Sequence, residues 1–245
     1  VYEAENGKKG KFMCQSLTLY AGHARRYYGE WNDVPFQASR LCDEYGLDAL
    51  AVSEITRWLR KCHRAGVLSD ESTGIPISKL GSLEFMEALV HKISLREGLG
   101  EVLAQGIFKA ADLIGGGARE QLDDGVHRSG QTYLYGPREY IIAALLYATE
   151  PRPPWQVLHE IVKPLHYWLD WCDKVEGAYA SSEVFRAMSK RFFGSELAVD
   201  FSTYEGKALA AKRIQDREYA KECLVLCDFA WPIMLVAYSP DHVGD

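Results

Sequence analysis

The segment Ser82-Leu-Glu-Phe-Met-Glu-Ala-Leu-Val-His-Lys-Ile-Ser-Leu-Arg96 decides the fold class of this chain. Its apolar residues recur every three or four positions, which is the period of a helix with one buried face. Ser82 stands where an N-cap is expected, and Gly98 follows the segment as a stop signal. The segment therefore predicts an amphipathic helix that packs against other elements.

The same period extends over most of the chain. Further helices are expected at 34–46, 53–65, 99–114, 138–149, 155–172, 180–193 and 205–223. No run of alternating Val, Ile and Thr predicts a strand, and there is no internal repeat, heptad array or glycine-rich phosphate loop. The predicted fold class is therefore mainly α.

Length and composition limit the class of protein. The 245 residues are enough for one large domain or two ordinary ones, and 47 % hydrophobic residues with 25 % charged ones are typical of a folded protein. The net charge of -6 argues against a nucleic-acid partner, because binding to phosphates depends on clustered Lys and Arg. No apolar run is long enough for a transmembrane segment and no signal-peptide pattern is present, so we expect a cytoplasmic protein.

The polar, turn-rich segment 121–130 has the composition of a connection between domains. We therefore expect one helical domain at 1–125 and a second at 126–245. Because the chain begins at Val1 and stops abruptly at Asp245, we expect it to be an internal piece of a longer protein with an incomplete C-terminus.

The segment Asp43-Glu-Tyr-Gly46-Leu47-Asp48 stands where a predicted helix ends. Gly46 is well placed as a C-terminal cap, since glycine adopts the left-handed conformation that ends many helices. The carboxylates of Asp43 and Asp48 are able to accept hydrogen bonds from an amino-substituted ring. The alternative interpretation is an ordinary helix end followed by a loop.

A second segment, Glu222-Cys-Leu-Val225-Leu226-Cys227, has the same outline of an acidic residue, a small or apolar residue, Leu and a potential ligand. Two such turns, one in each half of the chain, predict a pseudo-symmetric site for a large cofactor between the domains. Cys223 and Cys227 are four positions apart and face one side of a helix, but a complete metal site needs about four ligands. Two buried apolar cysteines are the alternative.

These two motifs resemble those of the tungsten-dependent aldehyde ferredoxin oxidoreductases. Members of that family hold a tungsten bis-molybdopterin cofactor between the second and third of three domains with two Asp-x-x-Gly-Leu-(Cys/Asp) motifs. The first motif matches in full, and the second departs from it at Glu222 and Val225. The resemblance implies the two helical domains without the N-terminal domain that cradles the pterins. It also implies cofactor binding by Asp43, Gly46, Leu47, Asp48, Glu222, Val225 and Leu226.

The resemblance also implies metal ligands. The Cys that ends the second motif is a ligand of a 4Fe-4S cluster in the family, which points to Cys227. The other three cluster cysteines form a Cys-x-x-Cys-x-x-x-Cys segment before the first motif, and this sequence has no such segment.

The sequence after Thr149 distinguishes branches of the family. Aldehyde oxidoreductases usually continue there with Arg-Gly-x-x-His, whereas this chain reads Glu150-Pro-Arg-Pro-Pro-Trp-Gln-Val-Leu-His159. This form is more similar to the branch that contains the catalytic subunit of class II, ATP-independent benzoyl-CoA reductase. A protein Cys ligates tungsten in that branch, and the resemblance gives this role to Cys42.

The resemblance therefore implies low-potential reduction of the aromatic ring of benzoyl-CoA, or a related aryl-CoA, to a cyclic dienoyl-CoA. His159 is the candidate proton donor, because His titrates near neutrality, and a helix-face histidine is the alternative. Electrons would come from an iron-sulfur subunit or a ferredoxin, and the rest of the same subunit would complete the site. The alternatives are an aldehyde oxidoreductase that forms carboxylic acids and a cofactor-free helical interaction module.

Overall fold

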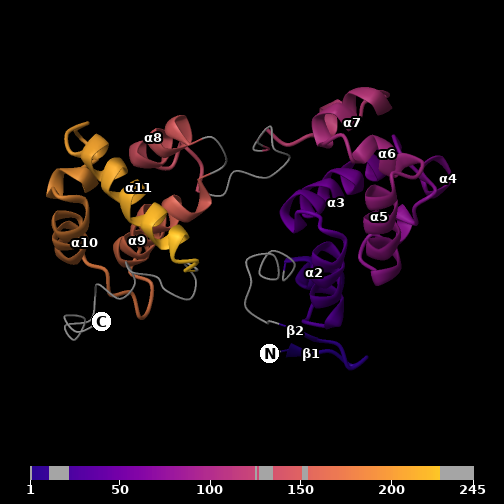
Figure 1. The fold of residues 1–245 in the computed structure, drawn as a ribbon, viewed down its shortest axis with the longest axis horizontal. Coiled ribbons are helices and arrows are strands. Elements are labelled where there is room, and N and C mark those ends of the chain that lie inside the picture. Colours follow the sequence, from indigo (N-terminus) through magenta and orange to yellow (C-terminus); the bar gives the residue numbers. More distant parts are fainter. Residues whose placement is uncertain (1, 11–21, 125, 127–134, 151–153, 227–245) are drawn as a thin grey trace. The chain divides into compact units, whose positions relative to one another are not determined.

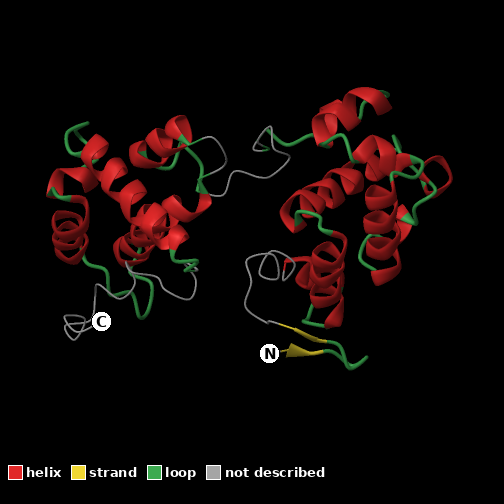
Figure 2. Ribbon diagram, viewed as in Figure 1, coloured by secondary structure: helices red, strands yellow, loops and turns green. Residues whose placement is uncertain are grey.

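The computed structural model describes residues 2–10, 22–124, 126, 135–150 and 154–226. Contacts divide the chain into two compact units, Val1–Thr132 and Tyr133–Asp245, and each is described by itself. The two functional domains expected at 1–125 and 126–245 stay a prediction. In both units the described residues are mainly helical, which confirms the predicted fold class (Figure 2).

The first unit contains six labelled helices and a short hairpin (Figure 1). The helices are α2 (Asp33–Tyr45), α3 (Ala49–Arg64), α4 (Asp70–Thr73), α5 (Leu83–Leu95), α6 (Leu99–Leu103) and α7 (Ile107–Ile114), with 3-10 turns at Ile77–Lys79 and Arg119–Gln121. Strands β1 (Tyr2–Glu3) and β2 (Lys9–Gly10) pair antiparallel, with Tyr2 opposite Gly10. The sequence did not predict this hairpin, because two-residue strands are too short to show a period.

The core of the first unit lies between α2, α3 and α5. Phe85, Met86 and Leu89 are completely buried on the predicted face of α5. The indole nitrogen of Trp58 donates a hydrogen bond to the Ala118 carbonyl at 2.8 Å, which ties α3 to the end of the unit. The amphipathic period of α5 was therefore a correct guide to its buried face.

The helices around Gly98 and Gly106 differ from the prediction. Ser82 caps α5 as predicted, since its side chain accepts a hydrogen bond from the Phe85 amide at 3.1 Å, but the helix ends at Arg96 with φ 58° and not at Gly98. The helix expected at 99–114 is two helices, because Gly106 takes φ 92° between them. At Gly100 a Cβ atom would lie 2.0 Å from the Lys92 carbonyl oxygen, so glycine lets α6 approach α5 closely.

The second unit contains α8 (Ile141–Thr149), α9 (Trp155–Cys172), α10 (Ser182–Met188) and α11 (Lys207–Cys223). A π-helical turn, Ser189–Phe193, follows α10, and a 3-10 turn lies at Glu196–Val199. The predicted helix 155–172 is confirmed with its bounds. Buried residues of α8, α9 and α11 form the core, among them Leu146, Leu158, Ile161 and Ile214. No helix of the described residues is long and apolar enough to cross a membrane.

Candidate functional site: two helix C-terminal corners

The first corner, Cys42–Asp48, ends α2 in a Schellman motif. Gly46 has φ 68° and ψ 29°, and its N–H donates to the Asp43 carbonyl at 3.2 Å. The N–H of Leu47 donates to the Cys42 carbonyl at 2.8 Å. These two bonds satisfy carbonyls that the helix end would otherwise leave without partners. The predicted role of Gly46 as a helix cap is confirmed.

Leu47 and Asp48, also in the first corner, fix the position where α3 begins. The Leu47 side chain packs against the core, and Cys42 belongs to the same core cluster. The Asp48 carboxylate caps α3, because its Oδ1 atom accepts from the amides of Leu50 at 2.8 Å and Ala51 at 3.2 Å. This cap starts α3 at Ala49, four residues before the expected start at 53. Leu47 and Asp48 therefore have structural tasks, whatever else they bind.

The outward side of the first corner carries Asp43 and the bare backbone of Gly46. Asp43 is exposed, and the nearest cation of its own helix is Arg40, whose Nη1 lies 3.7 Å from Asp43 Oδ2. A Cβ atom at Gly46 would meet nothing within 4 Å, so the space beside the backbone is open. An exposed carboxylate next to an open backbone fits the N–H edge of a flat heterocycle such as a pterin.

Cys42 lies on the opposite side of α2. Its side chain is 0 % exposed, within the apolar core of the first unit. A thiolate that binds a metal outside the unit has to reach the surface, and the sulfur of Cys42 does not. Within the described unit Cys42 has the position of a small apolar core residue, and its role as a tungsten ligand stays a prediction.

The second corner, Lys221–Leu226, repeats the backbone of the first. The N–H of Val225 donates to the Glu222 carbonyl at 3.0 Å, and the N–H of Leu226 donates to the Lys221 carbonyl at 3.0 Å. Val225 takes φ 57°, the same left-handed region as Gly46. The two predicted motifs therefore form the same turn at the ends of α2 and α11.

The second corner achieves this turn with an unfavourable residue. A β-branched residue at positive φ is a rare outlier, since its side chain crowds the following carbonyl. Val225 is 91 % exposed, so no packing of its side chain compensates within the described unit. Cys223 is also exposed, which corrects the buried alternative, and Cys227 lies outside the described residues.

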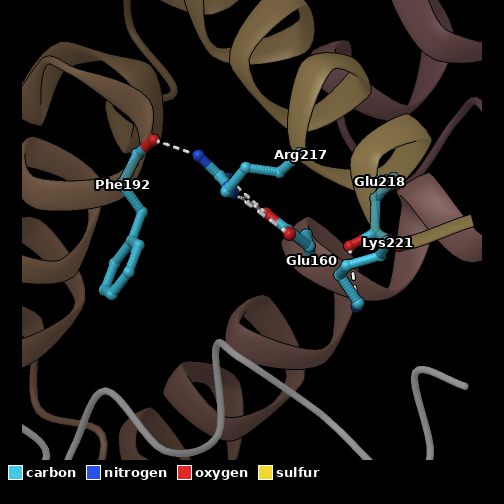
Figure 3. Close-up of polar contacts among 5 residues, drawn as sticks. All are labelled: Glu160, Phe192, Arg217, Glu218 and Lys221. Carbon is cyan, nitrogen blue, oxygen red and sulfur yellow. Dashed lines mark hydrogen bonds and ion pairs between the residues drawn. The ribbon is translucent and has the colours of Figure 1, made fainter. Parts of the chain in front are cut away.

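Buried charges hold α11 against α9 just before the second corner (Figure 3). The Arg217 guanidinium donates to both Glu160 oxygens, with Nε at 3.0 Å from Oε2, and its Nη1 donates to the Phe192 carbonyl at 2.7 Å. One turn later Lys221 Nζ lies 2.9 Å from Glu218 Oε1. Glu160, Glu218 and Lys221 are all buried. These residues were not predicted from the sequence, because a helical charge pattern does not show which charges are buried.

His159 lies inside the second unit and is 6 % exposed. Its ring contacts Tyr135 edge-on at a centroid distance of 5.3 Å, and Tyr135 also approaches His166 at 6.1 Å. Tyr135 takes φ 57°, and burial raises the pKa of its hydroxyl. A proton donor has to touch the substrate, so the burial of His159 does not favour that role, which stays a prediction.

Among the described residues, no group of three His, Cys, Asp or Glu side chains is arranged to hold a metal ion. The groups that fit the implied pterin cofactor are the acidic residue and the left-handed residue of each corner. Asp43 and the Gly46 backbone form one such surface, and Glu222 with the Val225 backbone stands at the matching place of the other.

Comparisons with known proteins show the family of the chain. The family model described as aldehyde ferredoxin oxidoreductase, domains 2 and 3, matches residues 33–244. The match covers most of the chain, so the chain belongs to the aldehyde ferredoxin oxidoreductase family. No solved structure matches.

Individual relatives show how far the similarity extends. The tungsten-containing aldehyde ferredoxin oxidoreductase of Pyrococcus abyssi is 27 % identical over 131 residues, which cover 52 % of this chain and 21 % of that protein. The WOR-like subunit of an aliphatic sulfonate oxidoreductase of Pyrococcus furiosus is 33 % identical over 73 residues, 30 % of this chain and 12 % of that subunit. The chain thus spans about a fifth of the length of the tungsten-containing relatives it matches.

Proposed function

We propose that the chain is the helical part of a tungstopterin oxidoreductase catalytic subunit, in which the two corners bind the pterins of a tungsten bis-molybdopterin cofactor. The observation that carries this proposal is the shared turn. The main-chain carbonyls of Asp43 and Glu222 each accept a hydrogen bond from the N–H of the residue three positions later, which has a left-handed conformation. The two motifs do this although they are in different units and differ in sequence. A helix end needs no acidic residue at this position, so the shared acidic residue supports a common ligand.

The bound cofactor would supply low-potential electron transfer, since thiolate-type sulfur is the ligand class suited to soft metal centres. The residues of the chain would recognise its organic part. The carboxylates of the exposed Asp43 and the partly buried Glu222 would accept hydrogen bonds from ring N–H groups, and Gly46 leaves room for a ring to approach the backbone. We propose Cys227 as a ligand of a 4Fe-4S cluster that delivers electrons one at a time.

For the reaction, we propose reduction of the aromatic ring of an aryl-CoA such as benzoyl-CoA. Its support is the Pro-rich sequence Glu150–His159, which lacks the Arg-Gly-x-x-His pattern usual in aldehyde oxidoreductases. Oxidation of aldehydes to carboxylic acids is the second candidate, which the similarity to tungsten-containing aldehyde ferredoxin oxidoreductases favours. The electron partner is an iron-sulfur subunit or a ferredoxin, and the rest of the subunit completes the pocket.

The cofactor site is tested with Asp43→Ala in the full-length protein, purified without oxygen. Glu44→Ala is the matched control, because Glu44 is the next residue, also exposed, and lies at a similar distance from Arg40, 3.9 Å against 3.7 Å for Asp43. We expect the Asp43 variant to lose tungsten and pterin, measured per mole of protein, with an unchanged melting temperature. The control keeps both. Full cofactor content in both variants contradicts the role of Asp43.

The reaction is tested with the same preparation. Ring reduction predicts that benzoyl-CoA is converted to a dienoyl-CoA product when a low-potential electron donor is present. Conversion of aldehydes with ferredoxin as acceptor, and no product from benzoyl-CoA, would support the second candidate instead. Protein without tungsten and iron would leave the helical interaction module as the explanation.

A further inference from the structure

The first unit has a cavity of about 510 Å³ at the C-terminal end of α3. Its walls come from the helical residues before Tyr28, from the last turn of α3 and from the turn at 77–82. Three arginines line it, namely Arg26, Arg60 and Arg64. We call this the arginine cavity.

The shape of the arginine cavity is fixed by contacts at Gly81. The Gly81 carbonyl accepts hydrogen bonds from His23 Nε2 at 3.0 Å and from Tyr28 Oη at 2.9 Å. A Cβ atom at Gly81 would lie 2.6 Å from the Tyr27 ring, so only glycine permits this approach. Two segments far apart in the sequence are therefore joined, and Tyr27 is held as an apolar wall beside the arginines.

The three arginines of the cavity form no ion pair with the described part of the chain, although the Asp123 carboxylate, whose pKa is lowered first by Lys61, lies close enough to Arg60 for the Arg60 charge to help lower that pKa. On the same helix, Arg57 and Lys61 both pair with Asp123. By contrast, no carboxylate of the described residues forms an ion pair with Arg26, Arg60 or Arg64. The Nε atom of Arg60 is buried and has no hydrogen-bond partner among the described groups. A buried guanidinium nitrogen without a partner is costly, which indicates that a ligand supplies the missing acceptor.

The other charges of the wall are compensated. Lys79 pairs with Glu84 at 2.8 Å, and the Asp70 carboxylate accepts from the Ser78 amide and hydroxyl. Burial, together with the positive charges of Arg26 and Arg64, lowers the pKa of Arg60. The uncompensated charge is therefore concentrated at the three arginines, where an anion would relieve their mutual repulsion.

We propose that the arginine cavity binds the phosphate group of a small molecule. Three guanidinium groups offer paired N–H donors, and a phosphate dianion provides more acceptor oxygens and more charge than one carboxylate. The volume exceeds that of a phosphate ion, so a phosphomonoester or diphosphate with an organic part fits, with the Tyr27 ring beside it.

The site is separate from the first corner. Asp48 caps the beginning of α3, whereas Arg60 and Arg64 lie at its other end, and the rise of the helix places about 20 Å between them. Phosphate binding therefore does not depend on the proposed cofactor.

Calorimetric titration of the full-length protein tests the proposal. The probes are inorganic phosphate, diphosphate and adenosine 3′,5′-bisphosphate, with succinate as the dicarboxylate control. Arg26→Gln and Arg64→Gln change exposed residues, so we expect the fold to be retained, and Arg60→Gln changes the partly buried residue whose Nε atom has no partner. Arg25→Gln is the matched control, since Arg25 is exposed, adjacent in sequence and not part of the cavity wall.

We expect binding of at least one phosphate probe, weakened about tenfold or more by Arg60→Gln and by Arg26→Gln with Arg64→Gln, because each charge-assisted contact contributes that order of affinity. The Arg25→Gln variant changes affinity by less than about twofold at physiological salt. The strongest probe distinguishes free phosphate or diphosphate from an organic phosphomonoester. Absence of phosphate binding, equal weakening by Arg25→Gln, or succinate binding as tight as diphosphate would overturn the proposal.

Discussion

The two corners have the same backbone hydrogen bonds but reach them by different means. At the first corner Gly46 supplies the left-handed conformation, and the apolar contacts of Leu47 fix the chain against the core. At the second corner Val225 takes the same conformation with a side chain that disfavours it, and buried ion pairs hold the helix before the turn. One turn geometry is thus compatible with two kinds of support.

The difference teaches that a sequence motif and a turn are not equivalent. When the two sequences alone are compared, Val225 in place of the glycine suggests that the second motif does not form the turn. The N–H of Leu226 nevertheless donates to the Lys221 carbonyl, and Val225 takes the left-handed conformation that this turn requires. Strain of this kind persists when the surrounding structure determines the conformation, and it is common at ligand-binding positions.

The largest effect is expected from breaking the support of the second corner. Glu160→Gln leaves the half-buried Arg217 guanidinium without its counter-charge, and breaking a buried pair costs about 3–5 kcal/mol. Denaturant unfolding measures the loss in the free energy of unfolding. The control Asp216→Asn removes an exposed pair with Lys212 and costs less than about 0.5 kcal/mol. Equal losses would show that the ion pairs do not support this corner.

An intermediate effect is expected from giving the first corner the residue of the second. Gly46→Val lowers the free energy of unfolding by about 1–2 kcal/mol, because the left-handed conformation crowds a Cβ atom. No neighbour lies within 4 Å of that Cβ, so the cost comes from the backbone. Gly22→Val, at a helical glycine with equally open space and no positive φ, is the control. A Gly46 variant as stable as the control variant would break the comparison.

The smallest effect is expected from the reverse change. Val225→Gly removes the strain but adds freedom to the unfolded chain, so the free energy of unfolding rises by up to about 1 kcal/mol. Val175→Gly, at another exposed valine that does not have a positive φ, lowers it by about 0.5–1 kcal/mol. Thermal melting of both variants gives the comparison. If both substitutions destabilise equally, Val225 is not strained.

Much of the fold was accessible from the sequence because helical periodicity is local. Helix 155–172 and the capping roles of Ser82 and Gly46 depend on residues within a few positions of each other, and the structure confirms them. The break at Gly106 was missed, since glycine is tolerated inside many helices and only packing reveals which one ends them. The sequence was sufficient to locate the two corner motifs, but it did not show that the Cys42 side chain lies in the core.

The sequence by itself determined a mainly helical chain, the positions of two acidic turn motifs and the family to which they belong. The helices and the motif positions follow from spacing along the chain, and the family follows from the similarity of its sequence to known members. Only the tertiary structure decided that Cys42 is buried, that Asp43 is exposed and that Asp48 caps a helix. It also decided that Arg57 and Lys61 are paired while Arg60 is not. The physical reason is that burial and charge compensation depend on which residues from distant segments fill the space around a side chain.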